Sequence, residues 1–181
     1  MYIPILLGTG RAGRQSEKVA NFMLAQAQTF GFDAELYDVR DYGSAVTIPA
    51  WVKNSKAAQW KSMVTRADGL LIVTPEYNHG YPGELKIVLD SLYDEYSRLP
   101  VGLCSVSDGR FGGARVAEHI LPVLHELGMF VVPKPLYFSN VKEVFDEAGK
   151  LTDSSYLDRV QKFLQGLQTY IALKKEWYEK Q

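Results

Sequence analysis

Short apolar runs alternate along this chain with longer segments whose apolar residues recur at helical spacing. The runs typical of strands are Ile3 to Leu7, Asp33 to Val39, Gly69 to Thr74, Val101 to Val106 and Phe130 to Val132. The segments typical of helices are Ser16 to Phe30, Asn54 to Ala67, about Gly83 to Tyr96, Ala114 to Leu127 and a last helix from Ser154. The chain therefore consists of repeated strand–helix units.

Strands that alternate with helices over short loops predict an α/β fold, with a parallel sheet covered by helices on both faces. Gly69 to Thr74 is the most apolar of the strand-like runs, so we expect it at the centre of the sheet. Two segments fit no unit and are interpreted as long loops, Tyr42 to Lys53 (with an exposed Trp51) and Lys134 to Thr152. One domain over residues 1–181 is expected.

Composition excludes several classes of function. The 181 residues are 46% hydrophobic and carry a formal net charge of -1 with both signs mixed, so a nucleic acid is not expected as a partner. No apolar run would span a membrane and the first residues lack a signal-peptide pattern, so we expect a cytoplasmic protein. The single cysteine, Cys104, rules out an internal disulfide, and no Cys/His cluster predicts a metal site.

The loop after the first strand, Gly8 to Ser16, has the residues of a phosphate site. Its glycines allow close approach to an anion, the following helix supplies unpaired N–H groups, and Thr9, Arg11 and Ser16 add side-chain donors. The same glycines also match a dinucleotide fingerprint, with Asp38 where a ribose-binding acid would lie, but such a match alone is weak. We favour a monophosphate over a dinucleotide here.

The loop after the third strand, Thr74 to Lys86, combines prolines, glycines and aromatic residues. Such a stiff loop is suited to present backbone groups to the edge of a flat heterocycle. The loop after the fourth strand, Ser105 to Arg115, is rich in glycine, and its Asp108 would oppose a reduced anionic ring unless it points outward. The helix from Gly83 to Tyr96 has more apolar residues than one sheet contact needs, which predicts a second copy packed against it.

These motifs resemble those of the NAD(P)H-dependent FMN reductases of the flavodoxin-like fold. Gly8-Thr9-x-Arg11-x-Gly13-Arg14-x-Ser16 is similar to their phosphate loop, and the segment from Pro75 to Lys86 is similar to their flavin-ring loop. The resemblance covers roughly residues 1–132 and implies FMN, a five-stranded parallel sheet of order 2-1-3-4-5 in a three-layer sandwich, and dimers or tetramers.

The resemblance also implies which residues contact FMN. Its phosphate would be held by Thr9, Arg11 and Ser16. Its ring would be bordered by Pro75, Glu76, Tyr77 and Asn78, with an amide N–H near Tyr77 or Asn78 facing flavin N5, and by Ser107, Gly112 and Gly113 of the third loop.

The expected function is an oxidoreductase that passes hydride from NAD(P)H through FMN to a small acceptor such as a flavin, a quinone, an azo dye or chromate. Because the cofactor supplies the chemistry, no catalytic acid, base or nucleophile is required, and we name no catalytic residue. Arg11, Arg14 and Arg110 are alternatives for contact with a 2′-phosphate. The competing hypotheses are a flavodoxin-type electron carrier, which the balanced charge disfavours, and a dehydrogenase that binds NAD without flavin.

Overall fold

A computed structural model describes residues 1–53 and 55–179, of which the side chains through Trp177 are described. The strands, in chain order, are β1 (Tyr2–Leu7), β2 (Asp33–Asp38), β3 (Leu70–Pro75), β4 (Pro100–Val106), β5 (Phe130–Val131) and β6 (Leu136–Phe138). The α-helices are α1 (Ser16–Phe30), α2 (Ala58–Thr65), α3 (Gly83–Leu89), α4 (Ala114–Glu126), α5 (Val141–Val144) and α6 (Ser155–Glu179). Short 3-10 turns are η1 (Val39–Tyr42), η2 (Ser55–Ala57) and η3 (Asp94–Tyr96).

The strands form a parallel sheet of order β2-β1-β3-β4-β5, with β6 also paired to β4. The predicted order 2-1-3-4-5 is therefore confirmed, and β3 lies at its centre as expected. This is the doubly wound order in which loops at the carboxyl ends of β1 and β3 flank the reversal of winding direction.

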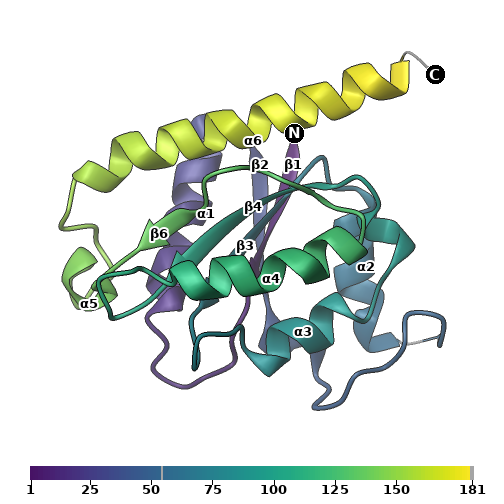
Figure 1. Cartoon of the computed structure of the whole chain (residues 1–181), viewed down its shortest axis with the longest axis horizontal. Helices are drawn as coiled ribbons and strands as arrows, with labels where there is room; N and C mark the ends of the chain where they lie inside the picture. The colour runs from purple at the N-terminus through teal and green to yellow at the C-terminus, as the bar shows by residue number, and fades with distance from the viewer. Residues whose placement is uncertain (54, 180–181) are drawn as a thin grey trace.

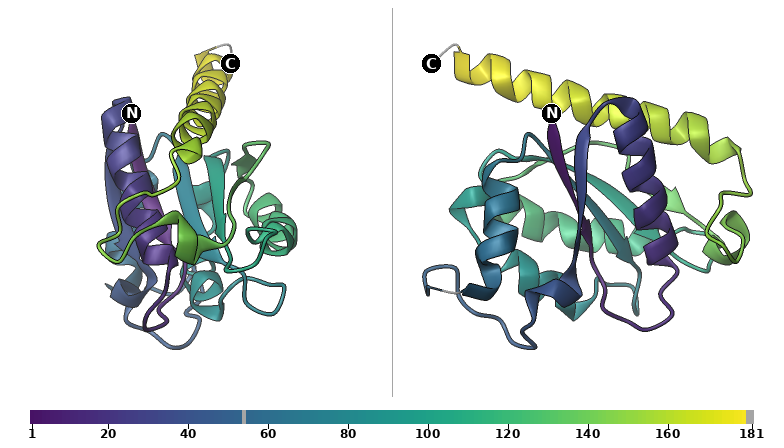
Figure 2. Two further views of the ribbon diagram at one scale, coloured as in Figure 1. Left: turned by 90° about the vertical axis from the view of Figure 1, so that its left-hand side faces the viewer. Right: turned by 180° about the vertical axis from the view of Figure 1, so that it is seen from behind.

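The sheet is covered on both faces, which makes the three layers visible edge-on in Figure 2. On one face, α1 packs on β1, whose Ile3, Ile5 and Leu7 are buried there, and α6 packs on β4 and β6. On the other face, α2, α3 and α4 pack on Leu6 and neighbouring strand residues. Successive residues of a strand point to opposite faces, and both faces of the central β3 are buried, so β3 is continuously apolar as the sequence predicted, whereas the edge strand β2 alternates apolar and charged residues. The long α6 runs across the whole sheet and past its edge (Figure 1).

The predicted helix from Gly83 to Tyr96 was too long. The helix α3 ends at Leu89, and the Ser91 hydroxyl donates to the Val88 carbonyl at 2.6 Å, a local bond that competes with continuation of the helix. The chain then turns through η3, which buries Tyr96 against Trp60, whose Nε1 donates to the Tyr96 hydroxyl at 2.6 Å. Leu92 and Tyr96 thus serve the core rather than a longer helix face, while Tyr93 stays half exposed.

The segment from Lys134 to Thr152 is not the long loop that was predicted. It contains β6, whose Leu136 pairs with Cys104 of β4, and α5, followed by an antiparallel bridge between Phe145 and Leu151. β5 and β6 lie along successive stretches of β4 and act as one edge strand interrupted between them. Prolines in the interruption hid the strand pattern, and proline is tolerated at a sheet edge because no neighbouring strand needs its N–H.

The helix predicted from Asn54 to Ala67 is α2, preceded by η2. Asn54 itself lies outside the described residues. Trp51, in the loop between η1 and η2, is 88% exposed, as expected for that loop.

Candidate functional site

The loops that follow β1, β3 and β4 meet at the carboxyl edge of the sheet around a cavity of about 370 Å³. Of the predicted site residues, the structure places these on its lining: Arg11, Ser16, Pro75, Glu76, Tyr77 and Ser107. Thr9 lies directly behind the lining, since its hydroxyl is 3.0 Å from the Tyr77 hydroxyl. Asn78, Gly112 and Gly113 are not part of the lining. The cavity thus joins the predicted phosphate loop to the predicted ring loop.

The phosphate end of the cavity contains donors that the protein leaves unused. Ser16, the first residue of α1, is 1% exposed, and its hydroxyl has no hydrogen-bond partner among the described residues. A buried hydroxyl without a partner is costly, so an absent acceptor is the natural explanation. The Arg11 guanidinium lies 5.6 Å from the centre of the Tyr77 ring and is solvent-exposed. Together with the positive end of α1, these groups fit the phosphate of FMN.

Arg14 has a different role from Arg11. Its side chain is buried and donates to the Thr9 carbonyl, to Asp38 and to Glu17. Burial alone would raise the pKa of Asp38. The hydrogen bonds from Arg14 and Arg40 outweigh burial and hold this pKa well below its usual range. Arg14 therefore fixes the first loop to the end of β2, and because both of its terminal nitrogens are engaged, although its buried Nε has no partner among the described residues, it is poorly placed to meet a 2′-phosphate.

The same contacts weigh against the dinucleotide hypothesis. Asp38 was to bind a ribose, but its carboxylate accepts from the Arg40 backbone N–H at 3.0 Å and from the guanidinium groups of Arg14 and Arg40. An acid whose oxygens are already occupied by two guanidinium groups is poorly placed to recognise a sugar hydroxyl.

The second loop is held in one conformation by a tight turn. The Tyr77 N–H donates to the Gly80 carbonyl and the Gly80 N–H to the Tyr77 carbonyl, both at 2.9 Å. The two residues between them, Asn78 and His79, have φ of 49° and 68°, as in a two-residue hairpin turn with left-handed backbone at both positions. Of the two amides that were predicted to face flavin N5, that of Tyr77 is therefore used inside the turn and that of Asn78 is not.

The Glu76 side chain connects the second loop to the third. Its carboxylate accepts from the backbone N–H groups of Arg115 at 3.1 Å and Val116 at 3.4 Å, in the first turn of α4, and its other oxygen lies 3.4 Å from the Arg115 guanidinium. An anion at a helix N-terminus compensates the unpaired N–H groups there. The side chain of Glu76 is thus a helix cap, and its backbone N–H donates to the Val106 carbonyl at 3.0 Å, so neither of these groups is free to face a ring.

In the third loop, Ser107 lines the cavity and its Oγ accepts from the Gly109 N–H at 3.1 Å. Asp108 is exposed, lies on the cavity lining and pairs with Lys142 at 2.6 Å, so its charge beside the cavity is compensated. Sequence reasoning missed Lys142, which also lines the cavity, because the segment that contains α5 was interpreted as a loop.

Gly112 and Gly113 are required by the packing of this loop. Both have positive φ, 59° and 83°. A Cβ on Gly112 would lie 2.9 Å from Tyr137 Cβ, and one on Gly113 would lie 3.0 Å from Ser105 Cβ, so a side chain at either position would collide with β6 or β4. Their contact with a cofactor stays a prediction.

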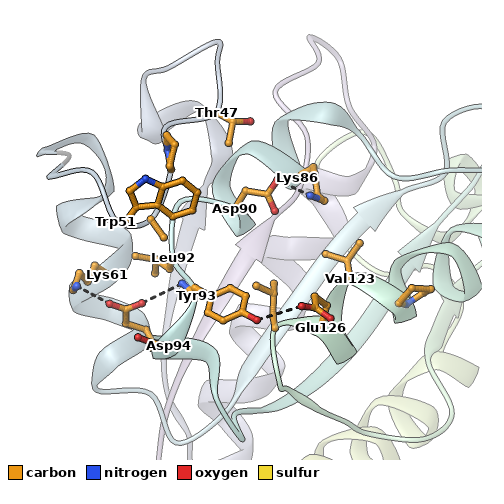
Figure 3. A pocket seen from close by; sticks show the side chains of 15 residues that line it. Thr47, Trp51, Lys61, Lys86, Asp90, Leu92, Tyr93, Asp94, Val123 and Glu126 are labelled. Atoms are coloured by element: carbon orange, nitrogen blue, oxygen red, sulfur yellow. Dashed lines mark hydrogen bonds and ion pairs between the residues drawn. The ribbon is translucent and has the colours of Figure 1, made fainter.

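A larger groove of about 940 Å³ lies elsewhere, over the outer side of α3 and the end of α4 (Figure 3). It is closed on one side by Trp51 and Thr47 of the loop between η1 and η2, and it shares no lining residue with the cavity at the carboxyl edge. On its floor the Tyr93 hydroxyl donates to Glu126 at 3.2 Å, and Lys61 pairs with Glu95 at 2.6 Å. With neither a glycine loop nor a free helix N-terminus, it is not built for a phosphate.

Within residues 1–53 and 55–179, no helix has both the length and the apolar character needed to cross a membrane. In the same residues no three side chains among His, Cys, Asp and Glu gather as metal ligands would.

Comparison with known proteins agrees with this geometry. Residues 1–143 match a family described as NADPH-dependent FMN reductase. The chain is 36% identical over 138 residues to a quinone reductase of Escherichia coli K12, covering 71% of this chain and 68% of that protein. It is 32% identical over 118 residues to an NAD(P)H-dependent FMN reductase of Pseudomonas aeruginosa, covering 62% of this chain and 64% of that protein.

Among solved structures, the chain is similar to FerB, a flavoenzyme NAD(P)H:(acceptor) oxidoreductase from Paracoccus denitrificans. The TM-score is 0.78, with 19% identity, and the match covers 96% of this chain and 98% of FerB. At that identity the likeness concerns the fold alone. The predicted three-layer α/β architecture is confirmed by this match and by the strand order.

Proposed function

The chain belongs to the family of NADPH-dependent FMN reductases, and we propose that it binds FMN at the carboxyl edge of its sheet and transfers hydride from NAD(P)H to a small electron acceptor. Membership in this family confirms the resemblance seen in the sequence. The chain matches 64% and 68% of the lengths of the two relatives named above, so activity, substrates and partners are proposed here on the residues of this chain.

The observation that carries the proposal is the unused hydroxyl of Ser16 at the start of α1, inside a cavity that the ring loop also lines. The phosphate of FMN would be held by Ser16, Arg11 and the N–H groups of α1. Thr9 would hold the Tyr77 hydroxyl between the phosphate end and the ring end of the cavity. The bound flavin would supply the hydride-accepting chemistry.

The remaining residues would position the ring. Pro75, Glu76 and Tyr77 form one wall of the cavity and Ser107 lies on another. The turn at Asn78 would present its backbone N–H to the ring, and Gly112 and Gly113 would bring the third loop close to it. Since two loops are already fixed to each other by Glu76, the protein would bind the ring with little rearrangement.

The test is the visible spectrum of the purified protein after reconstitution with FMN, before and after anaerobic addition of NADPH or NADH. Bleaching of the flavin band is expected, followed by its return when a quinone is added. A flavin that stays oxidised with both nucleotides would favour an electron carrier instead. Failure to retain any flavin would overturn the proposal of an FMN site.

We also propose that a second copy of this chain covers the groove over α3. Its surroundings include Trp51, 88% exposed, and Tyr93, 50% exposed, which is unusual for large aromatic residues in solvent. Since α3 begins at the ring loop, a copy docked there would lie near the cavity, in agreement with the dimer or tetramer expected from the sequence. Light scattering should give a dimer or tetramer, and Tyr93→Glu should yield a monomer; a wild-type monomer would contradict this assembly.

A further inference from the structure

An exposed aromatic ring between two arginines projects from the loop after β4. Phe111 is 53% exposed. The guanidinium carbon of Arg110 lies 4.9 Å from the centre of its ring and that of Arg115 lies 5.3 Å away. Exposing a phenylalanine has no benefit for folding, and the flanking cations raise the local positive potential. This Arg110–Phe111–Arg115 cluster has the composition of a site for an aromatic anion.

The two arginines differ in how far their charge is compensated. Arg115 lies 3.4 Å from Glu76. Arg110 forms no ion pair with any carboxylate among the residues described, and its guanidinium lies over the Phe111 ring. The free charge of the cluster therefore lies on Arg110.

The loop that carries the cluster is fixed in place and borders the cavity. The Gly112 N–H donates to the Gly109 carbonyl at 3.2 Å, the Ala114 N–H to the Phe111 carbonyl at 3.1 Å, and the Asn140 N–H to the Gly109 carbonyl at 3.3 Å. Earlier in the same loop, Ser107 lines the cavity. A ligand that extends out of the cavity along this loop would meet the cluster without a change in its backbone.

The three arginines that were alternatives for a 2′-phosphate differ in what already engages them. Arg14 is buried and occupied by Asp38, and Arg11 lies in the cavity beside the start of α1, where the FMN phosphate is proposed. Of the three arginines that were alternatives for a 2′-phosphate, Arg110 alone remains. NADPH differs from NADH by that phosphate, on the ribose next to the adenine.

We propose that Arg110 binds the 2′-phosphate of NADPH while Phe111 stacks on its adenine, so that this pair sets the preference for NADPH over NADH. The assignment rests on the proposed function for its role in the reaction. Arg115 would attract the 2′-phosphate more weakly, because its charge is already partly compensated by Glu76. Guanidinium groups suit this task because they form paired hydrogen bonds with phosphate oxygens.

The first test measures binding without the reaction. Titration calorimetry would compare adenosine 2′,5′-bisphosphate with 5′-AMP on the wild-type protein and on Arg110→Ala. The substitution should weaken binding of the bisphosphate by about tenfold and leave 5′-AMP unchanged. Equal binding of the bisphosphate to both proteins would overturn the assignment.

The second test uses steady-state rates with both nucleotides. Arg110→Ala should raise KM for NADPH by about tenfold with KM for NADH unchanged, Arg110→Lys should recover part of the loss, and Phe111→Ala should raise both KM values alike. Arg66→Ala is the matched control, because Arg66 also lies over an aromatic ring, that of Tyr2 at 3.9 Å, but at the opposite edge of the sheet. It should change neither KM.

The two proposals fail in different ways. If neither nucleotide bleaches the wild-type flavin, the reductase is excluded, and the calorimetry still decides whether Arg110 binds a 2′-phosphate. If Arg110→Ala raises KM for NADPH and NADH equally, or the wild type prefers NADH, the reductase stands and Arg110 is not the determinant of specificity.

Discussion

The first loop has two sides with opposite character. On one side, Arg14 is 1% exposed at its side chain and bonded to Asp38, Glu17 and the Thr9 carbonyl. On the other side, Arg11 is exposed and Ser16 keeps a buried hydroxyl without a partner among the described residues. The paired side holds the loop to β2, and the unpaired side leaves Arg11 and the Ser16 hydroxyl available to a ligand. Charge compensation, rather than residue type, separates structural groups from binding groups here.

The largest expected effect comes from breaking the paired side. Asp38→Asn would leave Arg14 as a buried cation with weakened compensation, and the free energy of unfolding should fall by about 3 kcal/mol. Urea unfolding of the flavin-free protein measures it. Asp158→Asn is the matched control, since its pair with Lys162 is 72% exposed at both side chains and should contribute less than about 1 kcal/mol. Equal losses in both variants would mean that the buried pair has no special role.

Asp38→Asn should also change how the stability of the protein depends on pH. The pKa of Asp38 is lowered in the folded protein, chiefly by hydrogen bonds from Arg14 and Arg40 that outweigh burial. Its contribution to stability is therefore complete above the ordinary carboxyl pKa of about 4 and is lost as the pH falls toward the lower, folded value. Wild-type stability should decline over that range, and the decline should be shallower in Asp38→Asn. Parallel curves would contradict the lowered pKa.

On the unpaired side, Arg11→Ala should act on ligand binding instead. Loss of a guanidinium–phosphate contact should raise the Kd for FMN by about 30-fold, with no change in the unfolding of the flavin-free protein. Riboflavin, which lacks the phosphate, is the control ligand, and its Kd should stay constant. If riboflavin weakens as much as FMN, Arg11 supports Tyr77, over whose ring it lies, rather than the phosphate.

Ser16→Ala should give a smaller loss on the same side. Its hydroxyl has no protein partner to lose, so the flavin-free protein should unfold as the wild type does, while the Kd for FMN rises by about tenfold. Thr29→Ala tests for a general effect of α1, because that hydroxyl bonds the Ala25 carbonyl at 2.9 Å within the helix. A loss of stability without a loss of FMN would show that Ser16 is structural.

The sequence predicted the elements that local patterns determine. It did not predict those that depend on contacts between residues distant in the chain. The strands and α1 were predicted closely because burial on both faces makes the apolar runs continuous, as in β3. The end of α3 was missed because the packing of Tyr96 against Trp60 depends on residues distant in sequence. β6 was missed because proline punctuates the edge strand that continues along β4.

The residues of the site also divide into those that local motifs identify and those whose contacts depend on the fold. The phosphate and ring loops are local motifs, so Arg11, Ser16 and Tyr77 could be named from the sequence and do line one cavity. The partners of Arg14 and Glu76 could not, since Asp38 and the start of α4 reach them only through the fold. A motif thus shows which residues are available to a ligand, and the tertiary contacts decide which of them are already occupied.

Glu76 is where the smallest effect should be seen, and it tests this division directly. Glu76→Ala removes the cap on α4 and should lower the free energy of unfolding by about 1 kcal/mol. Glu76→Gln keeps an acceptor for the Arg115 and Val116 N–H groups and should cost less. Because the side-chain carboxylate is engaged at the start of α4, the Kd for FMN should stay near the wild-type value in Glu76→Gln. If Glu76→Gln binds FMN much more weakly than the wild type while its free energy of unfolding is unchanged, the Glu76 carboxylate binds the cofactor rather than capping α4.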